Sequence, residues 1–142
     1  MIIGESICEF RFRSFFMSGS LVCKMLVLFF RLSGLGWISL DIGEGMIRIL
    51  PVDPEPKLLA LDDVTDDFAY PIQSSDELNS YFGKDLLAVY KYAISDVEDG
   101  CIGVYFDFGG CGFSILESED NLSIVDGMIK FSDGVVLSKL EI

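Results

Sequence analysis

The amino-acid sequence, 142 residues long, predicts an α+β fold: a mostly antiparallel β-sheet meander of hairpins with one to three helices. Three observations lead to this prediction. Short runs rich in β-branched and aromatic residues recur between glycine-containing turns, which is typical of hairpins. A stretch that begins near residue 75 has a capping serine and early acidic residues, which is typical of a helix start. The length fits a single domain, 1–142, with a sizeable core.

The N-terminal part predicts at least one strand. Apolar and polar side chains alternate with period two from Cys8 to Arg13, as they do in a half-buried strand. The apolar run 21–32 fits either a buried strand or a helix, and both remain open. Because charged residues interrupt this region, no uncharged run there reaches the roughly 18 residues that a membrane-spanning helix needs. Met17 is an alternative start, in which case residues 1–16 would be an upstream extension.

Three hairpins with glycine-containing turns are expected along the rest of the chain. The four prolines, at positions 51, 54, 56 and 71, assign the segment after the first hairpin to a loop or a sheet edge, because proline cannot donate a ladder hydrogen bond. The predicted hairpins join 37–42 to 46–50 through Gly43-Glu44-Gly45, 101–108 to 112–118 through Gly109-Gly110, and 128–131 to 135–140 through Ser132-Asp133-Gly134.

One helix is predicted over residues 75–82. Ser74 or Ser75 would cap its N-terminus, and the acidic residues that follow suit the positive end of the helix dipole. Gly83 would end it, since glycine is the usual residue after a helix. The run 86–94 could extend this helix or form a strand, and its tyrosines and Val89 favour a strand.

Composition excludes several kinds of chemistry. The chain contains no histidine, which removes histidine-based triads and histidine metal sites. Its formal net charge of -13 at pH 7 argues against binding to a phosphate backbone. The four cysteines, at positions 8, 23, 101 and 111, have no C-x2-C spacing, so we expect free thiols without a zinc or redox motif. We therefore expect no cofactor, no metal, no nucleic acid and no membrane association, and a cytoplasmic location.

The acidic segment 62–67 is the most distinctive local feature of the sequence. It lacks the spacing of a calcium-binding loop, and nothing nearby would raise a carboxyl pKa for acid catalysis. A solvated acidic surface is the simplest interpretation, and such a surface is also what a basic protein would meet. Together with two acidic residues at the expected helix start, the segment supplies the predicted partner-binding residues: Asp62, Asp63, Asp66, Asp67, Asp76 and Glu77.

The region of the second hairpin resembles one found in small acidic bacterial immunity proteins. The resemblance rests on Gly100 to Phe108, Phe113 to Leu116 and the Glu-Asp step within Glu119 to Ile124. Such proteins are encoded beside polymorphic or contact-dependent toxins. The resemblance implies a cytoplasmic α+β protein that binds and blocks one toxin, often a nuclease. These families share no binding motif, so no inhibitory residue is carried over.

The function predicted from these features is that of a non-catalytic acidic protein-binding domain, most concretely an immunity or inhibitor protein for a basic toxin. Its chain would be a monomer or a homodimer. The alternative is a structural or interaction domain of a larger assembly, whose charge serves solubility. A small enzyme that uses Asp/Glu pairs, with or without a metal, ranks last.

Overall fold

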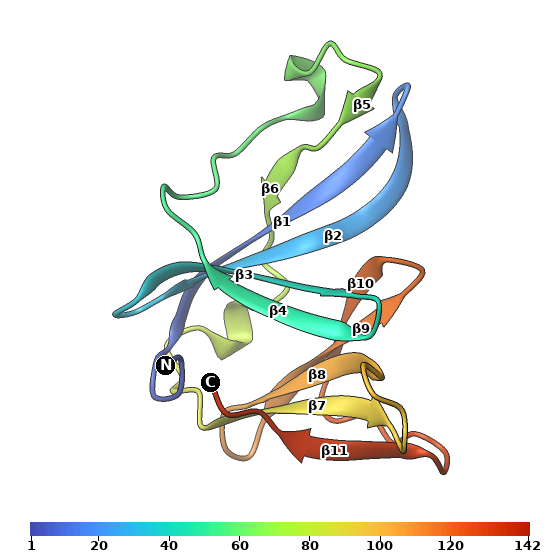
Figure 1. The fold of residues 1–142 in the computed structure, drawn as a ribbon. Coiled ribbons are helices and arrows are strands. Elements are labelled where there is room, and N and C mark those ends of the chain that lie inside the picture. Colours follow the sequence, from blue (N-terminus) through green and yellow to red (C-terminus); the bar gives the residue numbers. More distant parts are fainter.

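Two antiparallel β-sheets make up the fold in the computed structural model, which describes all residues 1–142 (Figure 1). Sheet 1 has the order β4-β3-β2-β1-β5, with β6 also paired to β1, and sheet 2 has the order β10-β9-β8-β7-β11. The strands of sheet 1 are β1 (Ile7–Met17), β2 (Ser20–Leu32), β3 (Gly36–Gly43), β4 (Met46–Pro51), β5 (Phe68–Ala69) and β6 (Ile72–Ser74). Those of sheet 2 are β7 (Ala88–Ile94), β8 (Cys101–Asp107), β9 (Gly112–Ser118), β10 (Asn121–Asp126) and β11 (Val135–Lys139).

Tight turns with positive φ at both central residues connect several of the hairpins. In the β3–β4 turn Glu44 has φ 52° and Gly45 has φ 75°, and in the β9–β10 turn Glu119 has φ 52° and Asp120 has φ 65°. Turns of this kind match the right-handed twist of the strands that they join. The predicted hairpins 37–50 and 101–118 are both confirmed.

The main core lies between the two sheets, because strand alternation turns one row of side chains from each sheet inward. Phe10 and Phe30 of sheet 1 stack at 5.3 Å, and Phe30 meets Phe106 of sheet 2 at 5.5 Å. Phe106 in turn lies 5.0 Å from Phe113. All four side chains are fully buried, and burying each contributes about 1.5–3 kcal/mol.

Backbone and side-chain contacts join the sheets at two further places. The Cys101 N–H donates to the carbonyl of Gly45 (2.9 Å), which attaches the β3–β4 turn to the start of β8. At the β9–β10 turn, the Met25 N–H donates to Oδ1 of Asn121 (3.1 Å), which attaches β2 to β10. The sheets are therefore connected by polar contacts as well as by the aromatic core.

The α+β prediction is wrong, because the structure is nearly all β and contains no α-helix. At the expected helix 75–82 only a 3-10 turn forms, η2 (Asn79–Tyr81). The Glu77 N–H does donate to Ser75 Oγ (3.2 Å), so the capping contact is present. The turn does not propagate, because starting a helix is costly and Leu78 and Tyr81 are instead drawn into the core.

The third predicted hairpin is also wrong. Residues 128–131 form no strand, and β11 pairs with β7 rather than with them. This segment covers Tyr92 of sheet 2: the Ile129 N–H donates to the Tyr92 hydroxyl (3.0 Å), and Phe131 lies edge-on to the Tyr92 ring at 5.1 Å. Of the two segments left open, 21–32 is a strand, β2, and 86–94 is mostly strand, β7.

Residues 1–16 are an integral part of this fold. They supply nearly all of β1, which lies inside sheet 1 between β2 and the pair β5 and β6. Ile2, Ile7 and Phe10 from this segment belong to the main core.

The positions of the four prolines agree with the sequence prediction, since Pro51 ends the edge strand β4 and the others lie in loops. No helix in the structure has the length and apolar character that crossing a membrane would require.

Candidate functional site

The end of the β1–β2 hairpin extends away from β3 and β4, with β5 beside it (Figure 1), and it carries exposed apolar side chains. Leu21 and Val22 are consecutive in β2, and yet they are 54% and 55% exposed. Consecutive strand residues point to opposite faces, so both faces of this hairpin end are uncovered. On the paired strand, Met17 is exposed as well.

Aromatic side chains continue this exposed surface onto β5. Phe15 stacks on Tyr70 at 5.0 Å and on Phe68 at 6.2 Å, and both of these partners are largely exposed. Groups of exposed apolar side chains mark interaction sites, and aromatic residues and methionine are enriched at protein interfaces. Here the exposed side chains occupy both faces of the hairpin end. We call this set the hairpin-tip surface, and it consists of Phe15, Met17, Leu21, Val22, Phe68 and Tyr70.

The acidic segment predicted from the sequence borders the hairpin-tip surface. Asp62 and Asp63 lie in the 3-10 turn η1 (Leu61–Asp63), and Asp66 and Asp67 lead directly into β5. The Ser18 N–H donates to the carbonyl of Asp67 (2.7 Å), which attaches the segment to the end of the β1–β2 hairpin. All four carboxylates are exposed, and none takes part in an ion pair. Their negative charge is therefore not neutralised by an ion pair within the chain.

Asp76 and Glu77 lie apart from the other four, between β6 and η2. They line an open hollow of about 730 Å³ whose floor includes Phe12, Met25 and Phe82. A second hollow of about 660 Å³ is lined by Asp63 and by residues 58–61. The two hollows share Ser74, so Asp63 lines a depression that adjoins the one lined by Asp76 and Glu77.

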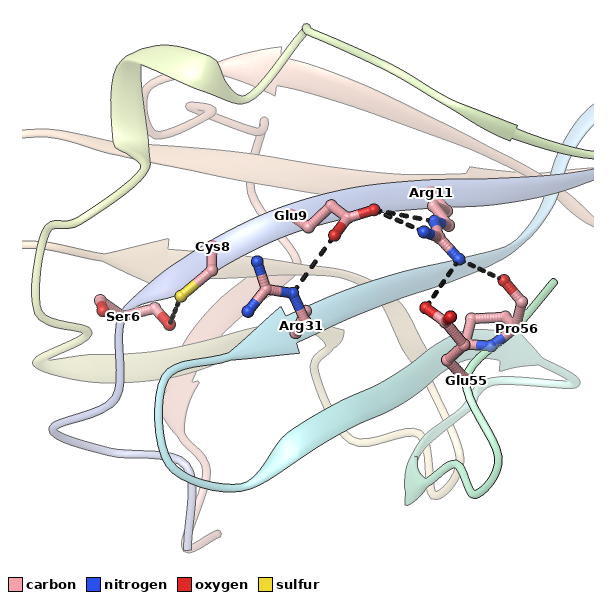
Figure 2. A network of polar contacts seen from close by, with 7 residues as sticks. All are labelled: Ser6, Cys8, Glu9, Arg11, Arg31, Glu55 and Pro56. Carbon is pink, nitrogen blue, oxygen red and sulfur yellow. Dashed lines mark hydrogen bonds and ion pairs between the residues drawn. The ribbon is translucent and has the colours of Figure 1, made fainter. Parts of the chain in front are cut away.

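A polar network fixes the chain that leads to the acidic segment (Figure 2). The Arg11 side chain, only 11% exposed, pairs with Glu9 at 2.7 Å and with Glu55 at 3.3 Å. It also donates to the carbonyl of Pro56 (2.6 Å), and its guanidinium lies 4.6 Å from the centre of the Trp37 ring. Segment 52–60 is thus fastened across the face of sheet 1 that points away from the main core.

Neither the network nor the hairpin-tip surface is among the features predicted from the sequence. The spacing of Glu9 and Arg11 places them on one face of a strand, but nothing near them in sequence indicates Glu55 as a partner. A signal for the hairpin tip was available, since Ser18-Gly19-Ser20 is a turn pattern between two apolar runs. That pattern predicts a hairpin whose end consists of Met17, Leu21 and their neighbours.

The four cysteines lie in different surroundings, and one of them, the half-buried Cys111, accepts a contact from the Lys84 ammonium at 3.5 Å. All four cysteines are free, as predicted, although only Cys23 and Cys101 are buried. Burial raises the pKa of both of these thiols, which keeps them in the unreactive neutral form at pH 7. No group of three or more His, Cys, Asp or Glu side chains is placed to hold a metal ion.

Comparison with known proteins adds no relative to this description: no protein-family model, curated protein or solved structure matches the chain. The end of the β1–β2 hairpin combines exposed apolar and aromatic side chains with a border of carboxylates that form no ion pair. Such an arrangement is suited to binding a protein, and its charge suits a basic one.

Proposed function

We propose that this protein is a non-catalytic acidic binding domain that blocks a basic protein, as an immunity protein blocks a toxin such as a nuclease, and that it acts in the cytoplasm. The observation that carries the proposal is the hairpin-tip surface, which is exposed and bordered by four aspartates without ion-pair partners.

The two parts of the site have different roles in this proposal. The apolar and aromatic side chains would supply the desolvated centre that carries most of the binding energy. The carboxylates at the border would steer a basic partner during encounter and would occupy its cationic groups in place of phosphates. The net charge of -13 adds a long-range attraction toward a positively charged partner.

The test begins with capture of a partner from an extract of the native cells. Its association and dissociation rates are then measured at two salt concentrations. Relative to wild type, the quadruple variant D62N/D63N/D66N/D67N should associate about tenfold more slowly at low salt and with a flatter salt dependence. A matched control, D96N/E98Q/D99N/E141Q, makes the same change in net charge at exposed positions on other loops.

The apolar centre is tested separately with Phe68→Ala and Leu21→Ala. Each should dissociate about tenfold to a hundredfold faster, with little change in association rate. A partner whose own activity stays unchanged in the complex would indicate an interaction domain of a larger assembly instead of an inhibitor. Equal rates for the acidic variant and its control, together with unchanged dissociation of the apolar variants, would exclude this surface as the interface.

A further inference from the structure

The edges of the two sheets differ in how well they are protected against pairing with another chain. β4 ends at Pro51 and carries an Arg48–Asp41 ion pair (2.7 Å), both of which discourage strand addition. β10 exposes mainly polar side chains, including Ser123 and Asp126, and β2 packs beside it. On the other side of sheet 1, β6 is short and Ile72 is already bridged to Leu59.

The edge strand β11 has neither the proline nor the intrachain ion pair of β4, and its first half is apolar. It begins with three consecutive apolar residues, Val135 to Leu137, and Val136 and Leu137 are 49% and 41% exposed. Its only neighbour in the sheet is β7, and its other edge is open. An apolar edge strand of this kind is a template for pairing with another strand.

The pairing register of β11 with β7 shows which N–H and C=O groups of β11 point to its unpaired edge. The Leu140 N–H donates to the carbonyl of Val89, and the carbonyl of Gly134 accepts from the Ser95 N–H, so even-numbered residues face β7. Alternate residues of an antiparallel strand direct their N–H and C=O groups to opposite sides. Val135, Leu137 and Lys139 therefore present their backbone groups to the open edge.

We propose that β11 pairs in an antiparallel manner with β11 of a second copy of this chain, which joins the two copies of sheet 2 across a two-fold axis. In the register that we propose, Val136 lies at the two-fold axis. Val135 then faces Leu137 of the partner subunit, and Lys139 faces Asp133 of the partner subunit.

Charge complementarity selects a second copy as the occupant. Lys139 lies at one end of β11 and Asp133 lies just beyond the other end, and neither forms an ion pair within its own chain. Antiparallel pairing of two identical edges brings each lysine to an aspartate, twice by symmetry. The register is constrained further because a slip by one residue would turn the outward-facing side chains to the opposite face.

The dimer leaves the hairpin-tip surface free, because β11 lies at the opposite end of the molecule from the end of the β1–β2 hairpin (Figure 1). Each dimer would therefore present two copies of that surface. This inference does not depend on the proposed function, and its test requires only the purified chain.

The test is sedimentation velocity over a range of protein concentrations from micromolar to hundreds of micromolar. Wild type should form a concentration-dependent dimer. Leu137→Pro removes an N–H that faces the open edge and leaves the β7 ladder intact, so it should weaken dimerisation at least tenfold. Lys139→Asp should weaken it as well, and adding Asp133→Lys should restore it, because the pair is re-formed with its charges exchanged.

Circular dichroism and unfolding curves show whether each variant folds. If Leu137→Pro does not fold, the proposal is tested by the comparison of Lys139→Asp with the double variant that also carries Asp133→Lys. Wild type that stays monomeric throughout, or a dimer that withstands both Leu137→Pro and Lys139→Asp, would overturn the proposal. A dimer weakened by Leu137→Pro but not restored in the double variant would overturn the proposed register.

Discussion

Gly45 lies where the β3–β4 turn meets the start of sheet 2, and its lack of a side chain permits that contact. Its φ of 75° lies in the left-handed region, and a Cβ there would overlap the carbonyl group of Asp99. Gly19, in the β1–β2 turn, has a similar φ of 81° but has no atom within 4 Å of the place of a Cβ. Alanine substitutions at the two glycines therefore separate the loss of stability caused by backbone strain from the loss caused by a steric clash.

We predict that Gly45→Ala lowers the free energy of unfolding by about 2 kcal/mol or more, and that Gly19→Ala lowers it by about 1 kcal/mol. The difference arises because only Gly45 adjoins another backbone segment. Urea unfolding at equilibrium measures both values. Equal losses for the two variants would show that the turn moves away from Asp99 at little cost.

Three buried titratable groups predict how stability depends on alkaline pH. Burial raises the pKa of Cys23 and Cys101 above the ordinary value of 9.0, and it raises the pKa of Tyr105 above 10.0. The unfolded chain therefore loses these protons at lower pH than the folded chain. Stability is fully present below about pH 9 and falls as the pH rises through the folded pKa values.

The measurement is the urea midpoint of wild type and of C23A/C101A from neutral pH to about pH 11. We predict that the midpoint of wild type falls above about pH 9 and that the midpoint of the double variant falls less, since two of the three groups are gone. Only the change of the urea midpoint with pH is compared, because the double variant also loses the packing of two buried side chains and is less stable at every pH. Parallel curves for the two proteins would contradict the assignment of the alkaline loss to these thiols.

At the scale of elements, segment 52–60 depends on Arg11 for its attachment to sheet 1. We predict that Arg11→Ala destabilises the fold by about 2–4 kcal/mol, because Glu9 and Glu55 lose their common partner and Trp37 loses its cover. Trypsin should cleave after the exposed Lys57 much faster in this variant, since the segment is released.

The control for Arg11→Ala is Arg48→Ala. Arg48 also forms an ion pair, with Asp41, but its side chain is 61% exposed, and exposed pairs contribute only about 0–1 kcal/mol. Cleavage after Lys57 should be unchanged in this control. Equal sensitivity of both variants to trypsin would mean that the network does not hold the segment.

The strands were predictable wherever local pattern and turn agreed. Cys101–Asp107 and Gly112–Ser118 are rich in apolar and aromatic residues, and Gly109-Gly110 between them favours a turn. The helix predicted over residues 75–82 is wrong because capping and charge are local signals. The burial of Leu78 and Tyr81, in contrast, depends on the sheets, which are distant in sequence. Residues 128–131 mislead in the same way, since Tyr92 is what they cover.

The candidate site was predictable to a smaller extent. The acidic segment was expected at the surface because charge runs are solvated, and it is exposed. Its position beside the end of the β1–β2 hairpin depends on β5 pairing with β1, which joins residues about 50 positions apart. Such pairings are set by the whole sheet, so no local pattern indicates them.

At the scale of the whole molecule, the net charge of -13 opposes the compact state. We predict that raising the ionic strength from about 0.01 M to about 0.1 M, which shortens the Debye length from about 30 to about 10 Å, raises the melting temperature. A gain of about 1 kcal/mol corresponds to roughly 3 to 6 °C for a chain of this size. Calorimetry measures the shift.

The control for the salt effect is D62N/D63N/D66N/D67N, which carries less charge and should gain less from salt. Both proteins are measured below the concentration at which they dimerise, so that association does not contribute to the melting temperature. A melting temperature that falls with salt in wild type would mean that attractive pairs outweigh the net repulsion.

The place of β11 beside β7 also has a consequence for synthesis on the ribosome. β7 leaves the exit tunnel long before the strand that will cover its edge, because Ile94 pairs with Val135. At about 5–20 residues per second, the delay is roughly two to eight seconds. During that time β7 and its apolar neighbours are exposed to other nascent chains, so a chaperone that binds extended apolar segments would act on this interval.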